Sequence, residues 1–331
     1  MRVAVFGAGR IGAVHAENLA TTGRADELLV IDEDLQRAAE VAQRVGAIAV
    51  APEAAWASEL DAVVIATPTR THAELVDRCI DRGLPVFCEK PLADDYPDTV
   101  ALVARVEQTG TRLQVGFMRR FDPPHAELRR LIRDGALGTV YAIRIASHDH
   151  DPAPESYIAT SGGIFRDLLI HDFDALRWIA GQEVRSVYAA GAIRRFDYVG
   201  KYGDVDTAAL VMVMEDGTLV SVSGGRENGR GEDNRVEVVG SADCVALGVG
   251  PQTPIRSLEP DADESDVEPY MDNFGRYTEA YRAELEHFLS LAVGEADDVS
   301  TARDGLAAVT IAVAAEMSVS QGRTVELSEV T

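Results

Sequence analysis

The sequence predicts an α/β fold, in which a doubly wound parallel sheet precedes an α+β domain with a large open, mainly antiparallel sheet. Apolar strand-like runs alternate with helix-like stretches up to residue 121, which is typical of a parallel sheet with helices on both faces. After residue 121, several strands follow one another through short turns, which indicates antiparallel pairing. The length of 331 residues suffices for two cores. We therefore predict domains at 1–121 and 122–331.

The first domain is predicted from six short apolar runs. The expected strands are 2–6, 27–31, 47–50, 62–66, 85–88 and 112–116. The expected helices between them include 11–20, 35–45, 71–81 and 95–109. Ligands of such sheets bind at the carboxyl ends of the strands. The residues that directly follow each strand are therefore the candidates for a binding site.

The second domain is predicted to contain more strands than helices. Its expected strands are 139–147, 184–192, 206–215, 218–224, 234–240 and 242–249, and its expected helices are 167–179, 274–291 and 301–318. Glu215-Asp216-Gly217 separates two of the strands, and Asp-Gly favours a hairpin turn. Residues 258–269 are acidic and contain two prolines, so we expect an exposed loop there.

A glycine-rich loop directly follows the first strand. Gly7, Gly9 and Gly12 have the spacing G-x-G-x-x-G, and a helix-like stretch begins within them. The first glycine permits a tight turn, the second lets the backbone approach a pyrophosphate, and the third lets the helix pack against the strand. The helix N-terminus at Arg10 and Ile11 offers free N–H groups to the phosphates. We interpret the segment as the dinucleotide-binding loop of a Rossmann domain, against the alternative of an ordinary strand–turn–helix.

The end of the second strand predicts which dinucleotide binds. Asp32 lies 20 residues after Gly12, where a carboxylate binds the adenosine ribose hydroxyls. A 2′-phosphate would be repelled there, because Glu33 and Asp34 follow and the first cationic side chain is Arg37. The sequence therefore predicts NAD rather than NADP.

Composition narrows the classes of partner. The net charge of −24, from 55 acidic and 31 basic residues, argues against nucleic acid and anionic membranes. The three cysteines, Cys79, Cys88 and Cys244, are unclustered and predict neither a disulfide framework nor a metal site. The first strand leaves no room for a signal peptide, and no apolar run approaches the roughly 20 residues of a membrane span. We expect a cytoplasmic protein with a small-molecule ligand.

Two residues near the middle of the chain predict proton transfer. Asp167 and His171 are four residues apart in an expected helix that follows Gly162-Gly163, so they would share one face. A histidine accepts protons near neutral pH, and a neighbouring carboxylate orients it. Oxidation of a hydroxyl to a ketone needs such a base. The alternative is a surface or helix-end pair, but apolar neighbours predict a buried helix, and a buried charged pair is costly without a role.

A lysine follows the fifth strand. Lys90 precedes Pro91, which lacks an N–H group and ends the strand at the edge where ligands bind. The ammonium group can donate to a substrate oxygen there and help withdraw its proton, whereas the alternative is a solvated loop lysine. Either His171 or Lys90 can be the immediate proton acceptor, because coupled groups titrate together.

These motifs resemble those of the glucose–fructose oxidoreductase / inositol dehydrogenase / MocA family, over nearly the whole chain. They are the glycine loop, Ala66-Thr67-Pro68 with His72, Glu89-Lys90-Pro91, and Gly162-Gly163 with Asp167 and His171. The resemblance implies that Lys90, Asp167 and His171 form the catalytic group. It also implies cofactor contacts from Gly7, Gly9, Gly12, Asp32, Thr67 and Glu89, and an open sheet face that mediates homodimers or homotetramers.

Within the family, the chain is most similar to inositol 2-dehydrogenases. Residues 116–122, 151–154, 161–167 and 277–288 carry this similarity. It implies oxidation of a ring hydroxyl of a cyclic polyol to a ketone, such as myo- or scyllo-inositol to an inosose, by an NAD-dependent enzyme. Arg120 and Asp151 are then candidate substrate contacts, in addition to Lys90, Asp167 and His171. For Arg120 and Asp151 the alternative is a structural salt bridge.

One segment departs from the pattern of the family. Near residues 229–234, many inositol dehydrogenases carry tyrosine, whereas this chain has Arg230 and Glu232. The inositol isomer, the carbon oxidised, the physiological direction and the subunit number stay open, and so does another sugar or anhydrosugar as substrate. A non-catalytic NAD-sensing regulator is a further alternative, although it would not need Lys90, Asp167 and His171.

Overall fold

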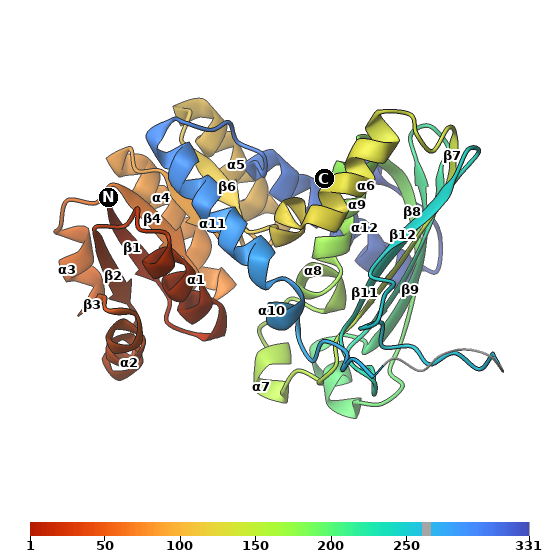
Figure 1. Cartoon of the computed structure of the whole chain (residues 1–331), viewed down its shortest axis with the longest axis horizontal. Coiled ribbons are helices and arrows are strands. Elements are labelled where there is room, and N and C mark those ends of the chain that lie inside the picture. Colours follow the sequence, from red (N-terminus) through yellow and green to blue (C-terminus); the bar gives the residue numbers. More distant parts are fainter. Residues whose placement is uncertain (260–265, 331) are drawn as a thin grey trace. The chain divides into compact units, whose positions relative to one another are not determined.

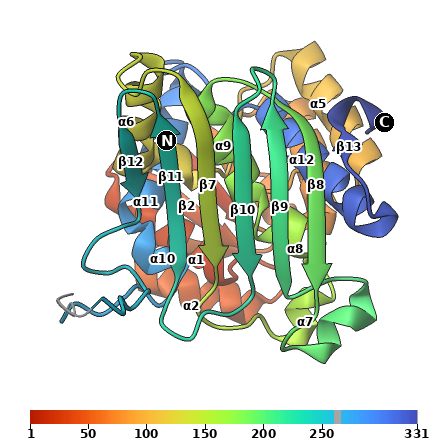
Figure 2. The ribbon, with the colours of Figure 1, turned by 90° about the vertical axis from the view of Figure 1, so that its right-hand side faces the viewer.

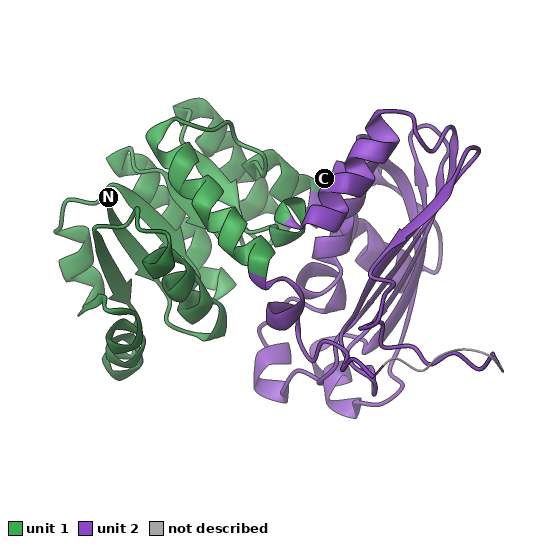
Figure 3. Cartoon of the chain, viewed as in Figure 1, with its two compact units in different colours: residues 1–121, 279–307 green, residues 122–278, 308–331 purple. Residues whose placement is uncertain are grey.

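The computed structural model describes residues 1–259 and 266–330 (Figure 1). The chain divides into two compact units, coloured green and purple in Figure 3. The first contains residues 1–121 and 279–307, and the second contains residues 122–278 and 308–331. Residues 279–307 thus belong to the first unit, which differs from the domain limits predicted above.

The first unit is built on six strands that are all parallel, in the order β3-β2-β1-β4-β5-β6. This order, with β1 and β4 at the centre, is that of a doubly wound nucleotide-binding sheet, as predicted. Its elements are β1 (Arg2–Phe6), α1 (Arg10–Thr21), β2 (Glu27–Ile31), α2 (Leu35–Val45), β3 (Ile48–Val50), α3 (Pro52–Trp56), β4 (Ala62–Ile65), η1 (Thr69–Thr71), α4 (His72–Arg82), β5 (Val86–Cys88), α5 (Tyr96–Thr109), β6 (Leu113–Val115), η2 (Met118–Phe121), nearly all of α11 (Thr278–Val293) and the start of α12 (Ala302–Gln321).

Helix α11 joins the first unit because its apolar side chains complete the core of that unit. Leu285, Phe288 and Leu289 are fully buried in one cluster with strand residues such as Val5 and Val64. The Phe87 and Phe288 rings lie 5.8 Å apart in an edge-on arrangement. Burial of a Leu or Phe side chain stabilises a fold by about 1.5–3 kcal/mol. The helix therefore belongs with the nucleotide-binding sheet despite its distance along the sequence.

The second unit contains a mixed, mainly antiparallel sheet of seven strands, in the order β12-β11-β7-β10-β9-β8-β13. Only β7 and β10 pair in parallel among the described strands of this sheet. The elements are α6 (Pro123–Arg133), β7 (Val140–His148), α7 (Glu155–Ile158), α8 (Ile164–Asp167), α9 (Ile170–Ala180), β8 (Val184–Ala192), η3 (Asp197–Tyr202), β9 (Thr207–Met214), β10 (Leu219–Gly225), β11 (Asp233–Gly240), β12 (Cys244–Leu247), α10 (Asn273–Arg276), the rest of α12, β13 (Val325–Glu326) and η4 (Leu327–Glu329).

The hairpin predicted at Glu215-Asp216-Gly217 joins β9 and β10. Gly217 has φ +93°, which a residue with a side chain rarely adopts. The Met214 N–H group donates to the Thr218 carbonyl at 3.0 Å and closes the turn. The Asp-Gly signal therefore locates this turn correctly.

The two faces of the second sheet differ in composition. One face is buried through alternate residues such as Leu210 and Met212, and α8 and α9 lie behind it in Figure 2. The opposite face of the sheet is turned toward the viewer in Figure 2. Tyr188 and Val211 are exposed, lie opposite each other on β8 and β9, and alternate with the buried residues, which assigns them to this face. This alternation is typical of an antiparallel sheet with only one face packed on the core.

The helix expected over 167–179 is interrupted, which corrects the sequence prediction. Helix α8 ends at Asp167 and α9 begins at Ile170. Between them the Leu169 N–H group donates to the Ile164 carbonyl, five residues back, and the Asp172 N–H group donates to the Leu169 carbonyl, three residues back. The regular i to i−4 pattern of one helix is therefore lost, and Asp167 and His171 lie in successive turns of two helices.

Three further predictions concern loops, cysteines and membranes. Leu258, at the start of the expected acidic loop, is exposed, and residues 260–265 of that loop lie outside the described residues. The three cysteines are free, with Cys79 and Cys88 buried and Cys244 exposed. Within residues 1–259 and 266–330, the helices are too short or too polar for a transmembrane span.

Candidate active site

The three loop glycines have three different environments. Gly7 has φ +99°, and a Cβ atom there would lie 2.3 Å from the Ala66 carbonyl oxygen. A Cβ atom on Gly12 would lie 2.0 Å from the Gly7 carbonyl oxygen, so this glycine lets α1 pack closely. A Cβ atom on Gly9 would meet nothing within 4 Å. The loop is thus tight at its two ends and open at Gly9, where a pyrophosphate is expected to approach the N–H groups at the start of α1.

A matched pair of alanine substitutions separates packing from binding in this loop. We expect Gly9→Ala to change stability by less than about 0.5 kcal/mol but to weaken NAD binding about tenfold or more, which is about 1.4 kcal/mol. We expect Gly12→Ala to destabilise the fold by about 1–3 kcal/mol, because the added methyl group overlaps backbone. Thermal unfolding and NAD titration measure the two effects. Normal NAD binding by a stable Gly9→Ala variant would contradict the assignment.

Asp32 lies at the carboxyl end of β2 and is surrounded by donors. Its carboxylate accepts hydrogen bonds from the Ala8 N–H group at 2.8 Å and the Asp34 N–H group at 2.9 Å. The Arg37 guanidinium donates at 2.7 and 3.2 Å. Burial alone would raise the pKa of Asp32, but these donors outweigh burial and hold the pKa below its ordinary value. Asp32 is therefore an ionised carboxylate at the carboxyl end of β2, and its contact with the ribose hydroxyls stays a prediction.

Helix α2 explains why Arg37 reaches Asp32. The side chain of Asp34 caps this helix by accepting from the Gln36 and Arg37 N–H groups. The helix thus begins immediately after β2, and Arg37 lies in its first turn, five residues from Asp32. The predicted role of Asp32 did not include Arg37, although Arg37 is the first cationic residue after it.

Thr67 and Lys90 belong to two loops that His72 connects. The His72 ring nitrogens lie 2.8 Å from the carbonyl oxygens of Thr67 and Pro91. The ring is buried, so it fixes the Thr67 loop after β4 against the Lys90-Pro91 segment after β5. The Lys90–Pro91 peptide bond is cis, and the Lys90 residue is half-buried. The two motifs are therefore neighbours at the carboxyl edge of the sheet.

Glu89 is held by a residue of the helix that follows the glycine loop. Its Oε1 atom lies 2.7 Å from His15 Nε2, and its Oε2 atom accepts from the Lys90 N–H group at 3.2 Å. Glu89 and His15 are both buried. This pair links α1 to the residue before Lys90. A direct cofactor contact by Glu89 stays a prediction.

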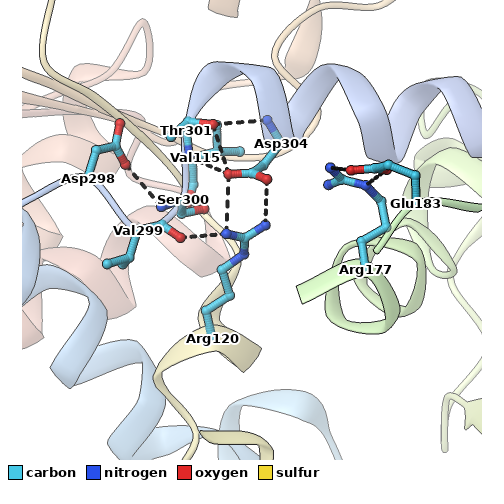
Figure 4. Close-up of polar contacts among 9 residues, drawn as sticks. All are labelled: Val115, Arg120, Arg177, Glu183, Asp298, Val299, Ser300, Thr301 and Asp304. Carbon is cyan, nitrogen blue, oxygen red and sulfur yellow. Dashed lines mark hydrogen bonds and ion pairs between the residues drawn. The ribbon is translucent and has the colours of Figure 1, made fainter. Parts of the chain in front are cut away.

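Arg120 was predicted either to contact the substrate or to form a structural salt bridge. The structure shows the salt bridge. Figure 4 shows its guanidinium facing Asp304, with Nη1–Oδ2 and Nη2–Oδ1 distances of 3.2 and 3.0 Å. Nη1 also donates to the Val299 carbonyl. Asp304 in turn accepts from the Thr301 N–H and hydroxyl groups at 2.9 and 2.8 Å. The guanidinium is committed to these partners, and a substrate contact by Arg120 stays a prediction.

Asp298 lies near this salt bridge, and its shifted pKa makes the stability of the fold depend on pH. Burial raises the pKa of Asp298 to about 6, from an ordinary value of 3.8. Because the folded pKa is above the unfolded one, Asp298 stabilises the fold below about pH 4, and this contribution is lost as the pH rises through about 6. The Ser300 N–H group donates to Asp298 Oδ1 at 3.0 Å, a bond that asparagine can keep.

We therefore expect Asp298→Asn to stabilise the protein at pH 7.5 but not at pH 4. The gain should be about 1–2 kcal/mol, since one pKa unit is worth about 1.4 kcal/mol and solvent screens a partly exposed carboxyl group. Urea unfolding at both pH values measures it, with the exposed neighbour substitution Asp297→Asn as the control. If the free energy of unfolding differs between Asp298→Asn and the wild type by the same amount at both pH values, the raised pKa of Asp298 is ruled out.

Asp167 lies in the second unit, and its carboxylate is bound by one side chain from α7 and one from the residue directly after β10. Its Oδ1 atom accepts from the Tyr157 hydroxyl at 2.7 Å, and its Oδ2 atom accepts from Arg226 Nη1 at 2.6 Å. Asp167 and Arg226 are both buried. His171 is half-buried in the first turn of α9. Sequence reasoning missed Tyr157 and Arg226, and the only signal for Arg226 is its position directly after the glycines that end β10.

The other predicted substrate residues of this unit lie on loops. The Asp151 side chain is 86% exposed, and its carboxylate is 3.6 Å from His150 Nε2, so its role as a substrate contact stays a prediction. Glu232, at the position of departure from the family pattern, is buried. It accepts from the Asn234 side-chain amide at 2.9 Å and from the His150 N–H group at 3.2 Å. Arg230 is exposed.

The fold and the site together define an NAD-dependent oxidoreductase. The doubly wound sheet, the loop open at Gly9 and the ionised Asp32 fit the pyrophosphate and ribose of NAD, and residues 1–117 match the oxidoreductase family with an NAD-binding Rossmann fold. Residues 125–245 match the GFO/IDH/MocA C-terminal domain. The chain belongs to the GFO/IDH/MocA family of oxidoreductases.

Several relatives are similar over their whole length. The chain is 38% identical to an inositol 2-dehydrogenase of Rhizobium meliloti, over 99% of both chains. It is 35% identical to a myo-inositol 2-dehydrogenase of Thermotoga maritima, over 100% of this chain and 99% of that one. The structure of a scyllo-inositol dehydrogenase from Lactobacillus casei with bound NAD(H) and scyllo-inositol has a TM-score of 0.88, with 27% identity over 99% of both chains. The resemblance inferred from the motifs is thereby confirmed at the level of the family of inositol dehydrogenases.

Proposed function

We propose that this enzyme oxidises a ring hydroxyl of a cyclic polyol to a ketone with NAD, most specifically as an inositol 2-dehydrogenase. The observation that carries the proposal is the similarity to an inositol 2-dehydrogenase over 99% of both chains. Lys90, Asp167 and His171, which the family resemblance identifies as catalytic, are all present. Both myo-inositol and scyllo-inositol are candidate substrates, because relatives named for each are similar to this chain.

The proposed chemistry divides among three side chains. Bound NAD supplies the hydride acceptor. His171 takes the proton of the hydroxyl as the C–H bond breaks, and Asp167 orients His171 and stabilises its charge. Lys90 donates to the same oxygen and polarises it. In the first unit, Gly7, Gly9, Arg10, Ile11, Gly12 and Asp32 hold the dinucleotide, and Thr67 and Glu89 are further candidate contacts.

The substrate preference is expected to depend on the segment that departs from the family pattern. In the segment near which many inositol dehydrogenases carry tyrosine, this chain has Arg230 and the buried carboxylate of Glu232. A carboxylate accepts hydrogen bonds from hydroxyl groups, whereas a tyrosine ring would pack against a sugar face. This difference favours testing other sugars and anhydrosugars as the second candidate class.

We also propose that the enzyme forms a homodimer or homotetramer through the open face of its seven-stranded sheet. Exposed apolar residues there include Tyr188, Val211 and Leu219. Clustered apolar surface of this kind is typical of protein–protein contacts. Sedimentation velocity of the wild type and of Val211→Lys tests the proposal, and an unchanged oligomer in the variant would place the interface elsewhere.

A substrate panel tests the proposed reaction. Absorbance of the reduced nicotinamide is followed with NAD or NADP, and with myo-inositol, scyllo-inositol and glucose. Reduction of NAD by an inositol supports the proposal, and the preferred isomer defines the substrate. Activity only with another sugar keeps the reaction type and changes the substrate. Measurable NAD binding without any turnover would instead favour an NAD-sensing regulator.

A further inference from the structure

A buried arginine lies among the acidic groups around Asp167. Arg226 directly follows β10 and is 2% exposed. Its backbone N–H group donates to the Asp206 carbonyl at 2.9 Å, which anchors the residue at the end of the strand. Its guanidinium contacts Asp167 at 2.6 Å and Asp204 at 3.5 Å, and Asp149 also interacts with it electrostatically. Burial of a guanidinium requires such compensation.

Asp204 connects this arginine to the helix that carries Asp167. Its Oδ1 atom accepts from the Ile164 N–H group, at the start of α8, at 2.8 Å. Asp167 is the last residue of the same helix. Arg226 therefore contacts Asp167 directly and also contacts the carboxylate that fixes the first residue of α8.

Tyr157 restrains the other oxygen of Asp167. Its hydroxyl donates to Oδ1 at 2.7 Å, while Arg226 donates to Oδ2. Burial and the charge of Asp167 raise the pKa of Tyr157, so the phenol stays protonated and remains a donor. Because each oxygen accepts from one of these donors, the orientation of the carboxylate is restrained by Tyr157 of α7 and by Arg226, the residue directly after β10.

We propose that Arg226 is a positioning residue for the oxidation, one that holds Asp167 as an oriented carboxylate anion throughout turnover. The proposal rests on the function proposed above. The proton released from the substrate hydroxyl then resides on His171, while the hydride leaves to NAD, and Asp167 contributes its charge without taking the proton. Tyr157 and Asp204 support Arg226 in this role. Arg226 itself need not touch substrate or cofactor.

The test compares Arg226→Met and Arg226→Lys with a control on the same unit. Arg177 forms a two-bond ion pair with Glu183 at 2.5 and 2.6 Å (Figure 4). This pair is more exposed than that of Arg226 and has no proposed role, so Arg177→Met is the control for loss of an arginine ion pair in the same unit. We expect Arg226→Met to lower kcat by about 10–100-fold, without a change in NAD affinity. Because an adjacent cation disfavours protonation of the groups beside it, loss of the guanidinium should raise the apparent pKa of the coupled Asp167–His171 pair, and the acidic limb of the kcat–pH profile should move to higher pH by about one unit.

Partial rescue distinguishes positioning from folding. Arg226→Lys keeps the charge and should restore the acidic limb toward that of the wild type, even if kcat stays low because one ammonium group cannot contact Asp167 and Asp204 as a guanidinium does. Arg177→Met should leave the limb unmoved. A wild-type limb in a folded Arg226→Met variant would overturn the proposal. If Arg226→Met fails to fold, Arg226→Gln replaces it, and a wild-type limb in that folded variant would likewise overturn the proposal.

A second measurement does not depend on turnover. The carboxyl carbon of Asp167 is titrated by ¹³C NMR in aspartate-labelled protein, with Asp167→Asn to identify the resonance. We expect the carboxyl group to titrate at higher pH in the Arg226 variants than in the wild type and in Arg177→Met, and equal titration would overturn the proposal. Absence of polyol turnover in the wild type would contradict the proposed function alone, since the NMR result is then still decisive for the restraint of Asp167 by Arg226.

Discussion

Replacement of His171 by alanine is expected to lower kcat by roughly 10²–10⁴-fold, which is the usual contribution of a general base. The hydroxyl proton would then have no acceptor at that position as the hydride departs. NAD binding should be unchanged, because the proposed cofactor residues belong to the first unit and His171 belongs to the second. Steady-state kinetics and NAD titration measure the two quantities on one preparation.

A second histidine supplies the control for this prediction. His287 in α11 is half-buried, and its Nδ1 atom lies 2.8 Å from Gln114 Oε1. His287→Ala should change kcat by less than about twofold, because His287 has no assigned role. If kcat of His171→Ala falls by less than about tenfold, the role of His171 as general base is contradicted. Equal losses of turnover and NAD affinity would point to a folding defect.

Replacement of Asp32 by alanine is expected to shift the cofactor preference from NAD toward NADP by about 10²–10³-fold. Hydrogen bonds to a charged group are worth about 1.5–3 kcal/mol each, so NAD loses affinity when the carboxylate is removed. The repulsion of a 2′-phosphate disappears at the same time. Arg37, which donates to Asp32 in the wild type, becomes able to bind that phosphate instead. The ratio of kcat/KM for the two cofactors measures the change.

The double variant Asp32→Ala/Arg37→Ala isolates the contribution of the arginine. It should lose most of the NADP activity gained by Asp32→Ala while its NAD activity stays similar. If the two variants use NADP equally well, Arg37 has no part in phosphate binding. A cofactor ratio that does not move in either variant would show that Asp32 does not select the cofactor.

The parts of the site that could be predicted depend on local sequence. Gly7 and Gly12 follow from the turn and the close packing that a strand–loop–helix unit needs, and Asp32 follows from its place at the end of the next strand. The parallel direction of the six strands follows from the alternation of strand-like and helix-like segments. In each case the relevant partners lie within a few tens of residues along the chain.

The parts that could not be predicted depend on partners that are distant in sequence. Arg226, directly after β10, is 59 residues from Asp167, and His15 is 74 residues from Glu89. Tyr157 is only 10 residues from Asp167, but no motif marks it. No spacing rule joins such residues. The interruption between α8 and α9 was also hidden, because Leu168 and Leu169 continue the apolar pattern and neither glycine nor proline marks the break.

The return of α11 to the first unit has a consequence for the order of folding during synthesis. The first 121 residues contain all six strands of the nucleotide-binding sheet, but the apolar core beside those strands is completed by Leu285, Phe288 and Leu289. At about 5–20 residues per second, translation from residue 121 to residue 293 takes roughly 10–35 s. During that interval the sheet must persist with an uncovered apolar surface. The most N-terminal part of this protein is therefore expected to be among the last to complete its folding, and a fragment that ends at residue 121 is expected to aggregate.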